Sequence, residues 1–216
     1  RGMILPKQER PDLPWTPVKA KPARDNFDSP TLSSEWYFVR IPQKAFHNLA
    51  NGQLTLTLQP EIVDSLVNSA MIIQKTKHHQ FKATTLLNFQ TKKDNEQAGL
   101  ILYRTANGYY SLLKDKSGIV LIKKHLEKKE IIEHIPYNKQ EVFLSVAVNG
   151  TEIQFSFGET QEHMINIGSI QNVAPLSDNK FNKFNGTGVG VYATSNGKQS
   201  RNKALYDWFE YISDNN

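Results

Sequence analysis

Short runs of alternating apolar and polar residues are the feature of this sequence that most constrains its fold. Leu54, Leu56 and Leu58 alternate with threonines, and segment 152–157 alternates polar residues with isoleucine and phenylalanine. A period of two residues is typical of a strand with one face buried, because successive strand side chains point to opposite faces. These segments therefore predict half-buried β-strands.

Turn signals join several of these runs into hairpins. Asn107-Gly108 separates the apolar runs 99–103 and 109–113, and Asn149-Gly150 separates 142–148 from the run that follows it. Asn-Gly is the strongest short hairpin signal, because both residues tolerate positive φ. Further strands are expected at 35–41, 72–77, 81–89, 119–122, 189–194 and 204–212. Roughly a dozen strands at this spacing predict an all-β fold of two antiparallel sheets packed as a β-sandwich.

Helical signals are nearly absent from the chain. Segment 61–67 is expected to form a single turn or a short helix within a loop. Segment 125–135 carries charges that suit a helix, but its isoleucines also suit a strand, so both alternatives stay open.

Segment 184–197 places glycines at 186, 188 and 190 before an apolar run and a turn at Asn196-Gly197. A phosphate-binding glycine loop requires a helix after the glycines. Here Val191 and Tyr192 follow them and favour a strand. The glycines are therefore interpreted as positions where a strand curves or another backbone comes close.

Composition excludes several classes of protein. The chain of 216 residues has no cysteine, so disulfides, thiolate metal sites and a cysteine nucleophile are excluded. Its net charge of +5 comes from lysines interspersed with acids, which favours solvated strand edges over a nucleic-acid surface. No apolar run approaches the roughly 20 residues that span a bilayer. No partner nucleic acid or membrane is expected, and the compartment stays open between the cytoplasm of a bacterium and its periplasm or exterior.

Residues 1–24 contain five of the ten prolines. Because proline has no backbone N–H to donate within a β-sheet, this composition predicts an extended linker. Leu13 and Trp15 within it are expected to pack against a surface. The predicted boundaries are a linker at 1–24 and one sandwich domain at 25–216. Because Arg1-Gly2 does not resemble a natural start, the chain is expected to begin inside a longer protein.

The residues that could carry chemistry are few. The acids fall mostly in turns, and the histidines lack metal-ligand spacing. A structural calcium ion held by Asp25, Asp28 and Asp207 is one hypothesis, since chain ends often lie close together; the alternative is that the first two cap a turn. Trp36 and Trp208 are expected in the core. The candidates to line a sugar-binding sheet face are Tyr103, Tyr109, Tyr110 and Tyr192.

Several segments, in order, resemble one known module. They are 22–28, Leu32 with 35–42, 81–85, 97–103, 190–197 and 206–211. Together they look like the C-terminal concanavalin A-like domain of family 43 β-xylosidases and arabinofuranosidases, over about residues 12–212. The resemblance implies a concanavalin A-like jelly roll. It also implies that the catalytic carboxylates belong to a five-bladed β-propeller upstream, so that no catalytic residue or catalytic cofactor is expected in this chain.

The resemblance also implies one contribution to substrate binding. In the family, a loop before the late glycine-bearing strand sends a phenylalanine into the propeller's pocket around the xylose. That residue matches Phe184 here, with Phe181 as the alternative; Gly188 and Asn185 depart from the family pattern. Burying an exposed phenylalanine against a partner contributes about 2 kcal/mol.

Three functions therefore compete. The first is an accessory module of a glycoside hydrolase that cleaves xylosides or arabinosides, bracing the catalytic propeller and completing its pocket. The second is an independent carbohydrate-binding module. The third is a concanavalin A-like glycosidase or lyase with a site of its own.

Overall fold

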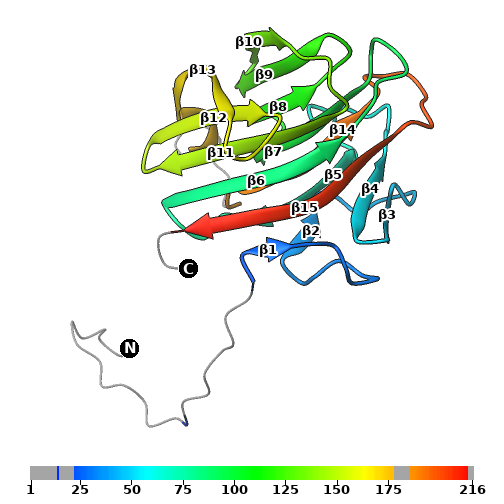
Figure 1. Ribbon diagram of the computed structural model, residues 1–216. Helices are drawn as coiled ribbons and strands as arrows, with labels where there is room; N and C mark the ends of the chain where they lie inside the picture. Colours follow the sequence, from blue (N-terminus) through cyan, green and yellow to red (C-terminus); the bar gives the residue numbers. More distant parts are fainter. Residues whose placement is uncertain (1–13, 15–21, 178–184, 214–216) are drawn as a thin grey trace.

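The computed structural model describes residue 14 and residues 22–177 and 185–213. These residues form fifteen strands and one short 3-10 turn, η1 (Ala174–Leu176). The strands make two sheets that lie face to face (Figure 1). The predicted all-β, two-sheet antiparallel sandwich is therefore confirmed. None of the helical structure in the described residues is long and apolar enough to cross a membrane.

The first sheet has eight strands, and its pairings are antiparallel. Along the sheet the order is β13 (Met164–Asn172), β12 (Glu152–Gly158), β11 (Glu141–Asn149), β6 (Gln80–Asn88), β15 (Lys203–Ser213), β4 (Gln53–Thr57) and β3 (His47–Ala50), with β1 (Arg24–Asp25) also paired to β15. The hairpin predicted at Asn149-Gly150 joins β11 to β12, and Gly150 has the positive φ of 61° that such a turn favours.

The second sheet has seven strands, again with antiparallel pairings. Its order is β10 (Lys128–Pro136), β9 (Gly118–His125), β8 (Gly108–Lys114), β7 (Gln97–Thr105), β14 (Gly188–Thr194), β5 (Ala70–Lys75) and β2 (Trp36–Phe38). The ambiguous segment 125–135 thus enters a strand hairpin, and 61–67 forms turns without a helix. The predicted hairpin at Asn107-Gly108 joins β7 to β8.

The main core lies between the two sheets and collects the inward side chains of both. A second cluster lies on the outer face of the seven-stranded sheet. On β7, for example, Leu100 and Leu102 belong to the main core, whereas Ile101 and Tyr103 belong to the outer cluster. Because strand side chains alternate between faces, a strand buried on both sides becomes a continuous apolar run.

Segment 59–68 covers this outer cluster, and we call it the covering segment. Val63 belongs to the cluster and donates its backbone N–H to the hydroxyl of Tyr192 at 3.1 Å. The hydroxyl of Thr194 donates to the carbonyls of Gln59 and Glu61, both at 3.2 Å. These bonds fix the segment to the end of β14.

Some expectations were incomplete or wrong. Strands β1, β3 and β13 were not predicted; β13 is exposed at most of its positions and has a register shift opposite Ile153 and Phe155, so its apolar alternation is weak. Trp36 is buried as expected. Trp208 is only partly buried, because a register shift after Tyr206 moves it out of the core to stack under Arg24 at 3.9 Å.

The glycine-bearing strand β14 lies in the middle of the second sheet, between β5 and β7. A Cβ on Gly190 would lie 2.2 Å from the carbonyl oxygen of Ile72, and one on Gly188 would lie 2.8 Å from the hydroxyl of Tyr37. The interpretation that these glycines allow close approach within a strand is therefore confirmed.

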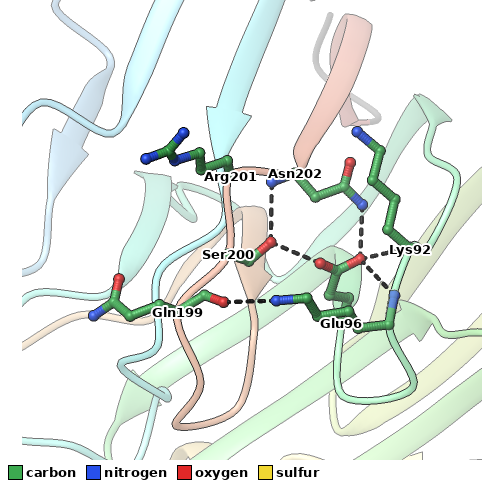
Figure 2. A pocket seen from close by; sticks show the side chains of 7 residues that line it. Lys92, Glu96, Gln199, Ser200, Arg201 and Asn202 are labelled. Atoms are coloured by element: carbon green, nitrogen blue, oxygen red, sulfur yellow. Dashed lines mark hydrogen bonds between the residues drawn. The ribbon is translucent and has the colours of Figure 1, made fainter.

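A buried carboxylate ties together two loops at one end of the sandwich (Figure 2). Glu96 has no exposed surface. Its carboxylate accepts hydrogen bonds from the backbone N–H of Lys92 at 2.7 Å and of Lys93 at 3.2 Å, from the Ser200 hydroxyl at 2.6 Å and from Asn202 Nδ2 at 2.7 Å. Burial alone would raise the pKa of Glu96, but these donors together lower it below 4.5. The loops before β7 and before β15 are thereby held by one charge.

Gly190→Ala is expected to lower the free energy of unfolding by at least about 3 kcal/mol, because the new Cβ meets backbone rather than a movable side chain. Gly186→Ala is the matched control, since its Cβ would find nothing nearer than 3.5 Å. It should change stability by less than about 0.5 kcal/mol. Denaturant unfolding of both variants measures the difference, and equal stabilities would contradict the close approach.

Glu96→Gln is expected to cost about 2 kcal/mol at neutral pH, because an amide cannot accept all four donors. A carboxylate whose folded pKa is depressed stabilises the fold above its unfolded pKa and loses that effect as the pH falls through the folded value. The gap between parent and variant should therefore be full at pH 7 and shrink below about pH 4.5. Urea unfolding at pH 7, 5 and 3.5 checks this, with the exposed Asp94→Asn as a control that changes little. A gap that stays constant with pH would refute the role of the charge.

Candidate functional site

One hollow on the outer side of the seven-stranded sheet gathers residues from five separate stretches of the chain. It has a volume of about 610 Å³. Its lining consists of Val39, Arg40, Asp64, Leu66, Tyr103, Thr105, Ala106, Asn107, Leu126 and Asn185. We call it the apolar-rimmed pocket.

Strand ends and turns position these side chains. Tyr103 and Thr105 stand at the end of β7, and the β7–β8 turn follows directly. Leu126 adopts a φ of +56° in the β9–β10 turn, and its N–H bonds the carbonyl of Asn107 at 2.7 Å. Asn185 is anchored by its Nδ2, which donates to the carbonyl of Arg104 at 2.7 Å. The pocket is thus built where several hairpins meet.

The pocket has one charged wall. Asp64, from the covering segment, accepts a hydrogen bond from the Tyr109 hydroxyl at 2.5 Å. The ammonium groups of Lys129 and Lys124 lie 3.5 and 3.7 Å from its carboxylate. Burial, followed by the bond to Asp64, raises the pKa of Tyr109 strongly, so this hydroxyl stays protonated and donates.

Buried polar groups lie deeper in the same region. Burial raises the pKa of Tyr103, and the charge of Arg40 and a hydrogen bond with it partly oppose this. Burial lowers the pKa of Arg104. The Oδ1 of Asn185 is buried and has no hydrogen-bond partner among the residues that the structure describes. An unpaired buried acceptor is costly, which favours a donor supplied from outside the described chain.

Large apolar side chains are exposed around this pocket. Leu66 is 79% exposed and Leu126 is 40% exposed, and both line it. Ile41, at 89%, directly follows the lining residue Arg40, and Val67, at 52%, accepts a hydrogen bond on its carbonyl from Arg40 at 3.4 Å. We call Ile41, Leu66, Val67 and Leu126 the apolar rim. Grouped exposed apolar side chains mark interaction surfaces in soluble proteins.

The sequence-predicted tyrosines divide between two faces: Tyr103, Tyr109 and Tyr192 belong to the outer cluster, and Tyr110 belongs to the main core. Tyr103 lines the apolar-rimmed pocket. Tyr110 lies between the sheets, fully buried, with its hydroxyl donating to the carbonyl of Asn172 at 2.8 Å. Tyr192 lies under the covering segment, where it accepts the N–H of Val63. The positions of Tyr110 and Tyr192 therefore lend no support to a sugar-binding role, because both are buried in packed structure.

The three aspartates considered for calcium are engaged separately. The two carboxylate oxygens of Asp25 accept the N–H of Phe27 at 2.9 Å and Nε1 of Trp36 at 2.8 Å. The carboxylate of Asp207 accepts from Gln53 Nε2. Asp28 lies beside Gly52, with its Oδ1 3.3 Å from where a Cβ on that glycine would be. Within the described ranges, no group of three or more His, Cys, Asp or Glu side chains could hold a metal ion. The calcium site stays a prediction, and Asp25 serves as the turn cap that was its alternative.

Phe184 and Phe181 lie outside the described residues, as does most of the proline-rich linker. Sequence reasoning named Tyr103 but missed Arg40, Asp64 and Asn185 as pocket residues. No sequence signal could have paired Asp64 with Tyr109, which is 45 positions away.

Comparison with known proteins identifies the module. Residues 24–212 match the family model described as the β-xylosidase C-terminal concanavalin A-like domain. A relative from Bacteroides ovatus, the non-reducing end α-L-arabinofuranosidase BoGH43B, is 29% identical over 97% of this chain and 41% of its own length. A xylosidase/arabinosidase from Butyrivibrio fibrisolvens is 26% identical over 85% of this chain and 36% of its own length.

A solved structure agrees with these sequence matches. The GH43 protein BlXynB of Bacillus licheniformis superposes with a TM-score of 0.88 at 26% identity, over 95% of this chain and 42% of that protein. The chain thus spans about two fifths of the length of the proteins it matches. On the family match and this fold, the chain belongs to the family of β-xylosidase C-terminal concanavalin A-like domains.

Proposed function

We propose that this chain is the accessory, non-catalytic module of a family 43 glycoside hydrolase that acts on xylosides or arabinosides. In this proposal, the apolar rim and pocket dock on a five-bladed β-propeller catalytic domain that precedes it in the same polypeptide. The observation that carries the proposal is the apolar rim itself, in a domain that matches only about two fifths of its relatives' length.

The chemistry of the rim suits a fixed intramolecular contact. Burying one Leu or Ile side chain contributes about 1.5–3 kcal/mol. Arg40 and Asn185, whose Oδ1 has no hydrogen-bond partner among the described residues, supply a donor and an acceptor in the pocket inside this rim. An apolar surface with a few polar groups at its centre is typical of stable interfaces.

The rim also lies at the base of the segment that carries the expected substrate-contacting residue. Asn185 lines the pocket and is tied to β7, and Phe184 directly precedes it in the chain. A rim docked on the catalytic domain would therefore bring Asn185, the residue that follows segment 178–184, next to that domain. We propose that Phe184, or Phe181 in the alternative register, completes the pocket that holds the sugar.

Ile41→Asp and Leu66→Asp in the full-length enzyme are expected to lower kcat/KM on aryl xylosides or arabinosides at least about tenfold, because a charge enters the docked surface. Ile170→Asp is the matched control: Ile170 is 59% exposed on β13, outside the rim. It should leave kinetics and thermal stability unchanged. If rim and control variants behave alike, the docking surface is wrongly assigned.

Phe184→Ala in the full-length enzyme is expected to raise KM and lower kcat/KM on the same substrates without changing the unfolding of this domain. Phe181→Ala separates the two registers, because only the phenylalanine that reaches the sugar should affect kinetics. Steady-state kinetics paired with thermal denaturation measures both. Unchanged kinetics in both variants would reject the loop's role while leaving the docking proposal to its own test.

A further inference from the structure

A second surface hollow lies at the other end of the sandwich. Two adjoining hollows of about 590 and 400 Å³ share Lys92, Arg201 and Asn202 in their linings. They lie between the loop that leads from β6 to β7 and the loop that leads from β14 to β15, with Gln140 at one side. We call the combined hollow the basic groove.

The charge of this groove is one-sided. Its lining carries Lys92, Lys93, Arg201 and Lys203, and Glu96 is the only acid that lines it among the residues the structure describes. The carboxylate of Glu96 is buried and engaged by four donors. Two exposed acids lie nearby: Asp94 pairs with Lys116 at 2.6 Å, and Glu141 accepts a hydrogen bond from the lining residue Asn88 at 2.9 Å. A solute in the groove therefore meets cations, while the negative charge of Glu96 is held behind them.

The cations differ in how they are held. Lys93 donates its ammonium to the carbonyl of Gln199 at 3.1 Å, which links the two loops. Lys92, Arg201 and Lys203 are exposed. In Figure 2 the ammonium of Lys92 and the guanidinium of Arg201 extend away from the carboxylate of Glu96. Because Glu96 fixes the backbone at Lys92 and bonds Ser200 next to Arg201, both side chains start from a braced backbone.

Side-chain amides supply the remaining polar groups. The exposed amides in the lining are Gln90, Gln140 and Gln199. The amide of Asn202 is buried and already used: its Nδ2 donates to the carbonyl of Gln90 at 2.8 Å and to Glu96 at 2.7 Å, and its Oδ1 accepts the N–H of Lys203 at 3.0 Å. Amides offer both donors and acceptors, which suits the hydroxyls of a sugar. Within the described part of the chain no aromatic residue lines the groove, so these residues offer no surface on which a nucleobase or a neutral sugar ring could stack. Binding would therefore depend on a negative charge, and an arginine can bind a carboxylate through two parallel hydrogen bonds.

The groove is also placed well away from the apolar rim. Lys92, Lys93 and Glu96 precede β7, whereas Tyr103 and Thr105 of the apolar-rimmed pocket stand at its far end. A strand of nine residues spans about 30 Å. A catalytic domain docked on the rim would leave the groove open to solvent.

We propose that the basic groove binds a carboxylate-bearing saccharide, that is, a uronic acid unit on the polysaccharide whose xylosides or arabinosides the enzyme cleaves. Arg201 and Lys92 receive the carboxylate, and the exposed amides of Gln90, Gln140 and Gln199 receive the hydroxyls. The choice of saccharide rests on the proposed function. The groove then acts as an anchor on decorated substrate, separate from the pocket where bonds are cleaved.

The test titrates the full 216-residue chain by calorimetry with three probes: a xylo-oligosaccharide bearing one glucuronic acid branch, the same oligosaccharide with that carboxyl reduced to an alcohol, and inorganic phosphate. The acidic oligosaccharide should bind at least about tenfold more tightly than the reduced one, and the difference should shrink in high salt. Phosphate should bind more weakly than the acidic oligosaccharide, since it lacks the sugar hydroxyls.

Arg201→Ser and Lys92→Ser should each weaken binding of the acidic oligosaccharide at least about fivefold, because each removes a charge-assisted hydrogen bond. Lys82→Ser is the matched control, an exposed lysine on β6 outside the groove, and should leave binding unchanged. Thermal denaturation confirms that all variants stay folded. Four results would each overturn the proposal. The acidic and reduced oligosaccharides bind equally, phosphate binds as tightly as the acidic oligosaccharide, none of the probes binds, or Lys82→Ser weakens binding as the groove variants do. None of these results would change the outcome of the kinetic test of docking. Failure of the groove proposal can therefore be told apart from failure of the proposed function.

Discussion

The close contact between the backbones of β14 and β5 is the constraint on which the rest of the structure depends. Because glycines stand at 188 and 190, β14 can lie against the backbone of β5 and under the side chains of Ile73 and Tyr37. The sheet formed there is apolar on both faces, so it needs the opposite sheet on one side and a cover on the other. The covering segment meets that need with hydrogen bonds to Tyr192 and Thr194 at the end of the same strand.

The cover also creates the exposed apolar surface that we propose for docking. Segment 59–68 buries the outer cluster but leaves its own Leu66 and Val67 exposed beside Leu126 and Ile41. An isolated domain gains nothing from such exposure, whereas a domain joined to a partner can use it for contact. The two ends of β7 and β14 therefore differ. The apolar-rimmed pocket lies at one end, and the cations and amides of the basic groove lie at the other.

Much of the fold could be predicted from local patterns, and the failures have identifiable causes. The alternation of apolar and polar residues predicted β4 and β12, and the Asn-Gly pairs predicted two hairpins. Both signals can be read from the sequence because they depend only on residues that are neighbours along the chain. Strand β13 was missed because an exposed edge strand needs little apolar alternation. Trp208 was assigned to the core because a strand of constant register would place it there; the register shift after Tyr206 moves it out.

The sequence by itself determined the all-β class, the absence of cysteine chemistry, the strand role of Gly188 and Gly190 and the resemblance to the β-xylosidase module. These properties follow from side-chain type and spacing along the chain. The tertiary structure alone decided that Tyr103 reaches a pocket while Tyr110 is enclosed, that Asp64 meets Tyr109, and that Glu96 joins two loops about a hundred residues apart beneath the basic groove. Such contacts depend on which strands become neighbours across a sheet and on which way each loop folds over it, and no local pattern encodes that information.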